Sequence, residues 1–138
     1  MISEEAVARI RQRIVRGPFG EYMDFIVDEL GEDRSVIRLP LRDQMTNTGG
    51  IVHGGATAAL VDTAATAAAW ATPRAGNDTM GTTVGFAINY LAPGKDDDLI
   101  AEATALQRGR NLTIVDVMVR DGAGRNIAKA QVTYKIGL

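Results

Sequence analysis

The chain has 138 residues, a formal net charge of −2 and no cysteine. This length is enough to bury one hydrophobic core. The lack of cysteine excludes disulfides, cysteine nucleophiles and thiolate metal sites. Because no block of basic residues is present, neither nucleic acid nor an anionic membrane is expected as the main partner. The single histidine, His53, excludes multi-histidine zinc sites, and no metal or cofactor is expected. Ser3 and Ser35 lie outside any G-x-S-x-G elbow, which closes the common Ser-His-Asp route to ester hydrolysis.

The first elements are a helix and two strands. Ser3 can cap a helix over residues 1–17, in which apolar residues recur every three or four positions until Gly17-Pro18 ends it. This segment is charged and has no apolar run, and no later stretch resembles a membrane span, so we expect a cytoplasmic location. Alternating apolar and polar residues then predict strands over Tyr22–Leu30 and Ser35–Leu39.

A long central helix is predicted over residues 53–71, because alanines dominate this segment and Thr72-Pro73 ends it. A helix with almost no polar face should be buried. Four further strands are expected, over Gly81–Leu91, Leu99–Leu106, Leu112–Val119 and Asn126–Ile136. One antiparallel sheet wrapped around the central helix satisfies this order, which predicts a single α+β domain over residues 1–138. The open sheet edges and the half-covered helix predict an oligomer.

Asp62 is the one charged residue between Gly54 and Thr72. A carboxylate in an apolar site costs several kcal/mol unless it is paired, so its presence requires a reason. One interpretation is structural, in which Asp62 caps a neighbouring element or pairs with an arginine from the sheet. The other is chemical, in which Asp62 is a general base or a nucleophile.

The segment His53-Gly54-Gly55 lies where this helix begins. Backbone N–H groups at a helix start lack intrahelical partners, and the two glycines let a substrate approach them closely. Such a turn suits the polarisation of a carbonyl, although a tight loop is its commoner meaning. Gly55 and Asp62 lie about two turns, or roughly 10 Å, apart, too far to act on one carbonyl. A second helix, antiparallel across a dimer axis, would bring one chain's helix start near the other chain's Asp62.

The run from Asn47 to Asp62 resembles the signature of hot-dog thioesterases, N-x-x-G-x-x-H-G-G-x4-L-x-D. It is most similar to the branch containing the phenylacetate-pathway thioesterase and the mammalian thioesterase-superfamily proteins. The segment Gly81–Gly94 also matches the next strand of that branch. The resemblance implies a hot-dog fold, hydrolysis of an acyl-CoA thioester, and a dimer or a dimer of dimers with active sites shared between chains.

The resemblance also implies residue roles. Asp62 occupies the position of the catalytic carboxylate, and Gly54 would offer its N–H to the thioester oxygen, with Asn47 and His53 as further contacts. Gly55 would lie against the substrate.

Two hydroxyls, Thr66 and Thr83, match positions that hold the attacking water in related enzymes, and Thr66 is expected to contribute more. Arg108 and Arg110, expected in a tight turn, would lie near the phosphates of coenzyme A, unless this turn is simply solvated.

Three functions remain open at this stage. The preferred one is acyl-CoA hydrolysis, with Asp62 activating water or attacking directly. A hot-dog enoyl-CoA hydratase or dehydratase is the second, although His53 does not obviously supply its catalytic histidine. The third is a non-catalytic acyl-CoA-binding dimer, which would be expected to have an apolar residue at the position of Asp62. The sequence leaves aryl and medium-chain alkyl acyl groups equally open.

Overall fold

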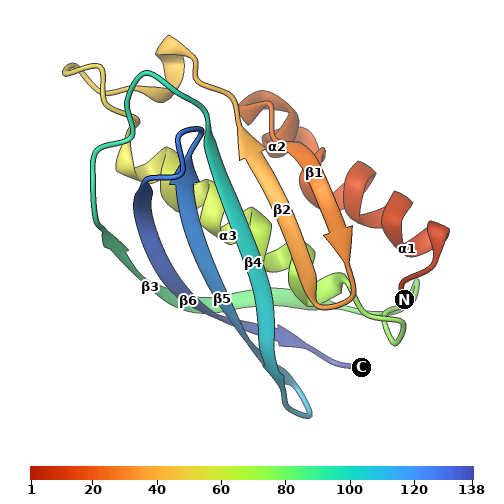
Figure 1. Cartoon of the computed structure of the whole chain (residues 1–138). Helices are drawn as coiled ribbons and strands as arrows, with labels where there is room; N and C mark the ends of the chain where they lie inside the picture. The colour runs from red at the N-terminus through yellow and green to blue at the C-terminus, as the bar shows by residue number, and fades with distance from the viewer.

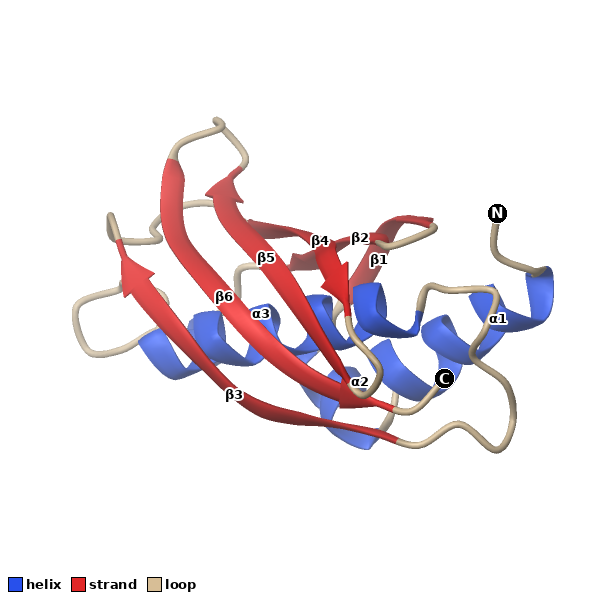
Figure 2. Ribbon diagram, turned by 90° about the horizontal axis from the view of Figure 1, so that it is seen from below, coloured by secondary structure: helices blue, strands red, loops and turns tan.

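The computed structural model describes residues 1–138 and contains one six-stranded sheet, in which every pair of neighbouring strands is antiparallel. The order across the sheet is β1-β2-β4-β5-β6-β3. The strands are β1 (Ile26–Gly31), β2 (Arg34–Leu39), β3 (Gly81–Tyr90), β4 (Leu99–Arg108), β5 (Leu112–Asp121) and β6 (Asn126–Ile136). The sheet curves over the long helix α3 (Gly54–Trp70) (Figure 1, Figure 2). This is the predicted α+β hot-dog architecture.

Helix α3 fits closely under the sheet because its buried side chains are mostly alanines. Small side chains let the strands approach the helix, and the Ser35 hydroxyl of β2 donates a hydrogen bond of 2.7 Å to the Ala64 carbonyl. One stripe of the helix stays partly open, and it is formed by Gly55, Ala58, Ala59, Asp62, Thr63, Thr66 and Trp70. The expected burial therefore holds for the face turned to the sheet, whereas Asp62 lies on the open face.

The N-terminal region differs from the prediction. Helix α1 (Glu4–Arg9) continues as a π-helix, η1 (Ile10–Val15), and a further helix, α2 (Pro18–Met23), precedes β1. The expected strand start at Tyr22 is therefore wrong. The first helical segment stops at Val15, before Gly17-Pro18, as expected. Pro18 also lies in the first turn of α2, where its fixed φ favours a helix start, and this second role was not predicted. Asp24, at φ 62°, then ends α2.

The edge strand β3 leaves large apolar side chains exposed. Strand β3 pairs with β6 on one side, and its other edge is free. It carries Val84, Phe86 and Tyr90 with exposed fractions of 59%, 39% and 53%. These large apolar side chains lie beside the open stripe of α3, so the surface along β3 is suited to a partner.

A short 3-10 helix, η2 (Asp43–Met45), lies in the loop that leads to α3. None of the helices combines the length and the apolar character needed to cross a membrane.

Candidate active site

The start of α3 presents one unpaired backbone donor. His53 is the N-cap: its Nδ1 accepts a hydrogen bond of 2.8 Å from the Gly55 N–H, and its carbonyl accepts from the N–H groups of Ala56 and Thr57. The Gly54 N–H has no acceptor within the chain. The helix start therefore offers a donor, at the positive end of the helix dipole, to an external oxygen.

Asn47 supplies a second donor next to Gly54. Its side-chain oxygen accepts hydrogen bonds from the N–H groups of Gly49 and Ile51, at 2.9 and 3.4 Å, which leaves the amide NH₂ to donate elsewhere. Asn47 and Gly54 both line a cavity of about 380 Å³. The Tyr90 hydroxyl, on β3, donates a hydrogen bond of 2.7 Å to the Gly54 carbonyl and fixes the helix start against the strand. This arrangement is suited to binding a carbonyl oxygen.

Asp62 lies two turns further along α3 and is half-buried. The Thr83 hydroxyl, from β3, donates a hydrogen bond of 2.6 Å to Asp62 Oδ1. The Thr66 hydroxyl donates instead to the backbone carbonyl of Asp62, at 2.8 Å, which is the usual use of a threonine within a helix. These hydrogen bonds favour Thr83 over Thr66 as the partner of the carboxylate, the opposite of the order expected from the sequence.

Tyr134 completes this region and was not identified from the sequence. It lies on β6 directly opposite Thr83, and its hydroxyl accepts a hydrogen bond of 2.9 Å from Trp70 Nε1. Burial raises the pKa of Tyr134 and the charge of Asp62 acts in the same direction, whereas the hydrogen bond from Trp70 and the nearby hydroxyl of Thr66 oppose the shift. With a pKa above its ordinary value near 10, the phenol stays protonated at neutral pH and remains a donor.

Gly81 makes room for this phenol. A Cβ atom at Gly81 would lie 2.8 Å from the Tyr134 hydroxyl, closer than such atoms approach without displacement. A side chain there would push Tyr134 away from Trp70 and out of the region around Asp62. Alternation along the last strand could have shown that Tyr134 points inward, but the contact with Trp70 joins residues 64 positions apart.

The structure thus groups the predicted residues in two half-sites. Asn47, His53, Gly54 and Gly55 form one, which we call the carbonyl half-site. Asp62, Thr66 and Thr83 form the other, which we call the carboxylate half-site. Eight residues of α3 separate Gly54 from Asp62, a rise of about 12 Å, so one chain does not bring the two half-sites onto one carbonyl.

Residues 49–128, more than half of the chain, match the family model of the thioesterase superfamily. This range includes α3, Asp62 and Thr83. The chain belongs to the thioesterase superfamily. Human acyl-coenzyme A thioesterase 13 is 31% identical over 104 residues, which cover 74% of this chain and 72% of that protein.

Solved structures of thioesterases agree with the fold. A thioesterase family protein from Silicibacter pomeroyi superimposes with a TM-score of 0.87 at 24% identity, covering 96% of this chain and 98% of its own. A Streptococcus pneumoniae thioesterase solved with coenzyme A gives a TM-score of 0.73 at 26% identity, covering 81% and 84%. The hot-dog fold of this superfamily member is therefore established, and thioester hydrolysis in general is supported.

Arg108 was expected to contact coenzyme A, but its guanidinium is engaged within the scaffold. It donates hydrogen bonds to the carbonyls of Ala68 and Ala69, at 3.1 and 2.9 Å, and to Asp33 Oδ1, at 2.7 Å. The side chain is 10% exposed. Strand β4 extends to Arg108, so this arginine belongs to the strand and not to the turn that was expected. Its side chain lies at the C-terminus of α3, where the positive charge complements the helix dipole.

This role predicts a loss of stability when the guanidinium is removed. Arg108→Met keeps much of the aliphatic side chain but leaves two helix carbonyls and Asp33 without their donor. The free energy of unfolding should fall by about 2–3 kcal/mol, measured by urea denaturation. Arg110→Met, in the exposed turn next to it, serves as the control and should change stability by less than about 0.5 kcal/mol. Equal effects of the two substitutions would contradict the scaffold role.

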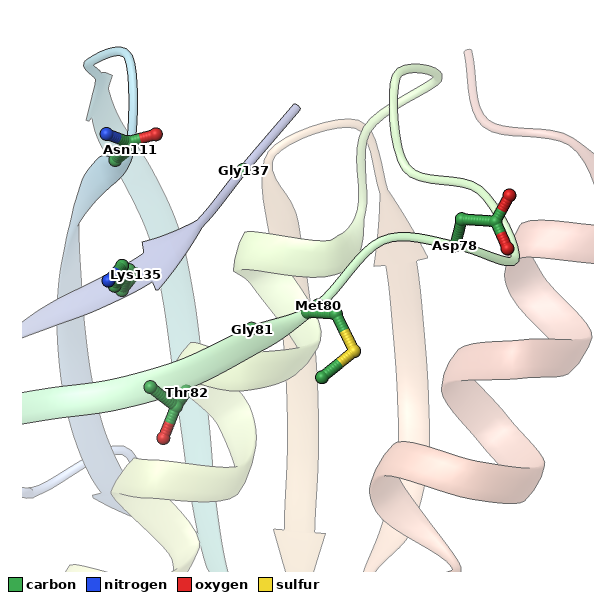
Figure 3. Close-up of a pocket in the computed structure, with 7 residues that line it drawn as sticks. All are labelled: Asp78, Met80, Gly81, Thr82, Asn111, Lys135 and Gly137. Atoms are coloured by element: carbon green, nitrogen blue, oxygen red, sulfur yellow. The ribbon is translucent and has the colours of Figure 1, made fainter.

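Arg110 is exposed and has no carboxylate partner within the chain. Its neighbour Asn111 lines the largest cavity, about 520 Å³, together with Lys135, Thr82 and Asp78. Asn111 and Lys135 lie on one side of this cavity and Asp78 on the opposite loop (Figure 3). No group of three or more histidine, aspartate and glutamate side chains is placed to hold a metal ion.

Proposed function

We propose that this protein hydrolyses an acyl-CoA thioester to a free acid and coenzyme A. Membership of the thioesterase superfamily supports thioester hydrolysis, and the similarity to human acyl-coenzyme A thioesterase 13 supports an acyl-CoA substrate. The observation that carries the proposal is the Asp62 carboxylate, held by Thr83 on the open face of an otherwise apolar helix. A merely structural aspartate would be expected to pair with a cation, and no arginine or lysine lies within 4 Å of it.

The chemistry follows from the free groups of the two half-sites. Thr83 occupies Oδ1 of Asp62, which leaves Oδ2 to accept a proton from water. The water oxygen attacks the thioester carbon, and the developing oxyanion accepts hydrogen bonds from the Gly54 N–H and the Asn47 amide. When the C–S bond breaks, the departing thiolate accepts from Asp62 the proton that Asp62 took from water. Direct attack by Asp62 is the alternative route, and it would form a mixed anhydride.

A second copy of the chain is needed to bring the half-sites together. We place it along the free edge of β3, antiparallel to the first copy, because apolar side chains are exposed there. A two-fold axis at Ala87 would set Thr83 opposite the partner's Tyr90, when the bulge between Thr83 and Gly85 is counted as one position. Asp62, bonded to Thr83, would then face the helix start to which the partner's Tyr90 is bonded. Each dimer would contain two shared active sites.

The hydratase alternative requires an imidazole beside the carboxylate. His53 instead caps α3 through Nδ1, so its proton is on Nε2, and it lies in the other half-site. Within one chain, a rise of roughly 13 Å along the helix separates it from Asp62.

The experiment that tests the proposal is thiol release from a panel of aryl and alkyl acyl-CoAs, followed with a chromogenic thiol reagent. Turnover of at least one member at a rate of about 1 s⁻¹ or more is expected. Hydration of an enoyl-CoA without thiol release would assign the protein to the hydratases. Tight binding without turnover would make it an acyl-CoA-binding protein.

The two threonines give a graded prediction. Thr83→Val removes the hydroxyl that fixes the carboxylate and should lower kcat by about tenfold or more. Thr66→Val removes a hydroxyl already bonded to the backbone and should have a smaller effect on kcat. Both substitutions conserve volume, and circular dichroism would confirm the fold. A larger loss of kcat in Thr66→Val than in Thr83→Val would indicate that Thr66 holds the attacking water.

The coenzyme A phosphates are best accommodated at the end of the sheet near Arg110. Lys135 and Asn111 line the large cavity beside it, and neither Arg110 nor Lys135 has a carboxylate partner. Arg108 is left out of this assignment because its donors are occupied.

A further inference from the structure

The open stripe of α3 leads from Asp62 toward the N-terminal helix. Asp62, Thr66 and Trp70 follow one another at intervals of four residues and therefore share one helix face. Trp70 lies a rise of about 12 Å beyond Asp62. A ligand chain extending along this stripe from a thioester at Asp62 would reach the indole of Trp70.

Trp70 also lines a cavity of about 310 Å³. Its wall combines apolar and basic side chains, among them Ile14, Met80, Arg9 and Arg13. It is a separate cavity from the one beside Lys135 and Asn111, although Met80, drawn in Figure 3, lines both. Apolar walls with two cationic groups suit a ligand whose chain is apolar and whose end is anionic.

The positive charges of Arg9 and Arg13 at this cavity have few carboxylates of the chain near them. Arg9 is 11% exposed on its side chain and donates a hydrogen bond of 3.2 Å to the neutral side chain of Asn77. Its nearest carboxylate, Glu5, is 3.6 Å away and largely exposed to solvent. Arg13 has no carboxylate within 4 Å. An anionic ligand would therefore find two guanidinium groups that can bind it.

The backbone at this cavity is also unusual. Arg13 and Ile14 belong to η1, a six-residue π-helix that interrupts the first helix. Such segments are rare and occur frequently at functional sites, because the wider turn changes the direction of the side chains. Here the π-helix contributes Arg13 and Ile14 to the cavity wall while Ile10 and Val15 remain buried in the core.

We propose that this cavity binds the far end of the acyl group, and that Arg9 and Arg13 select acyl groups ending in a second carboxylate. The proposal rests on acyl-CoA hydrolysis at Asp62 and names its substrate class, the CoA thioesters of dicarboxylic acids. An extended chain advances about 1.2 Å per bond, as an extended polypeptide does. The distance along α3 to Trp70 therefore matches about ten bonds, which is the shortest chain that brings a terminal carboxylate to this cavity.

The test compares CoA thioesters of straight-chain dicarboxylic acids with their ω-methyl esters, which have the same chain but no second charge. We define the selectivity as kcat/KM for the acid divided by kcat/KM for the ester. In the wild type it should exceed one for chains of about ten bonds or more and fall to one for shorter chains. Arg13→Gln should lower it by about fivefold to tenfold. Arg11→Gln, on the same helix but outside this cavity, is the matched control and should leave the selectivity unchanged.

Several results would overturn the proposal. A wild-type selectivity of one or below, or an Arg13→Gln selectivity equal to the wild type, would show that no terminal carboxylate is bound there. If Arg13→Gln weakens turnover of acid and ester CoA thioesters equally but spares N-acetylcysteamine thioesters, Arg13 binds a CoA phosphate instead. Arg9→Gln provides a second variant, although Arg9 also holds the loop at Asn77.

The outcome remains separable from that of the proposed function. If no acyl-CoA is hydrolysed, the proposed function fails, and calorimetry still tests the cavity with free dicarboxylic acids and their dimethyl esters. Stronger binding of the free diacid, lost in Arg13→Gln, would support the anion site. Equal affinity for diacid and dimethyl ester would refute it.

Discussion

Asp62→Asn should lower kcat by about 10²–10⁴-fold while the protein stays folded. Asparagine keeps the volume of the side chain, and its amide oxygen can still accept the hydrogen bond from Thr83. The substitution removes the group that takes the proton from water. KM should change little, because the carboxylate acts on the attacking water rather than on the bound substrate.

The control for this variant is Asp96→Asn, in an exposed turn. Asp96 has a φ of 62°, a conformation that asparagine also adopts readily, so neither stability nor kcat should change. Thermal unfolding of both variants would verify that the loss in Asp62→Asn is chemical. An unchanged kcat in Asp62→Asn would make Asp62 structural and remove the proposed mechanism.

Label found in Asp62 after a single turnover in H₂¹⁸O would establish that Asp62 attacks the thioester. If Asp62 is a general base, the label enters the product acid directly and the protein remains unlabelled. If Asp62 attacks the thioester, hydrolysis of the anhydride at the Asp62 carbonyl would place the label in Asp62. The general-base route is the proposed one, so no label is expected in Asp62.

The sequence was sufficient for the central part of the fold. Alanine content, the Thr72-Pro73 stop and the lone charge of Asp62 together predicted α3 within one residue at each end. The four later strands also begin where alternation and glycines indicated. In contrast, a proline can follow the end of one helix and start the next, and Pro18 does both, of which only the first was predicted.

The site was less predictable, because it depends on contacts between distant segments. Strand β3 has an irregular register between Thr83 and Gly85, which shifts the alternation of side chains along the strand. Such a bulge cannot be placed by counting residues, and it determines that Thr83 faces both Asp62 and Tyr134. The position of Arg108 depends similarly on how far β4 extends toward the end of α3.

Two inactive variants should regain activity when combined in one dimer. Asn47→Ala removes an amide that can bind the oxyanion and should lower kcat by about 10²-fold. Asp62→Asn damages the carboxylate half-site instead. If each active site joins the carbonyl half-site of one chain to the carboxylate half-site of the other, a mixed dimer has one site with both lesions. Its second site is intact.

Random assembly of equal amounts makes about half of the dimers mixed, so activity should recover to roughly a quarter of the wild type by this symmetry count. Co-expression with two affinity tags isolates the mixed dimers, whose activity should be about half of the wild type because one site of two is intact. Mixing the purified homodimers without exchange is the control. Recovery of activity is expected because Gly54 and Asp62 of one chain lie too far apart along α3 to act on the same thioester carbonyl. If verified mixed dimers stay as inactive as their parents, donor and base come from one chain, and the arrangement along β3 is wrong.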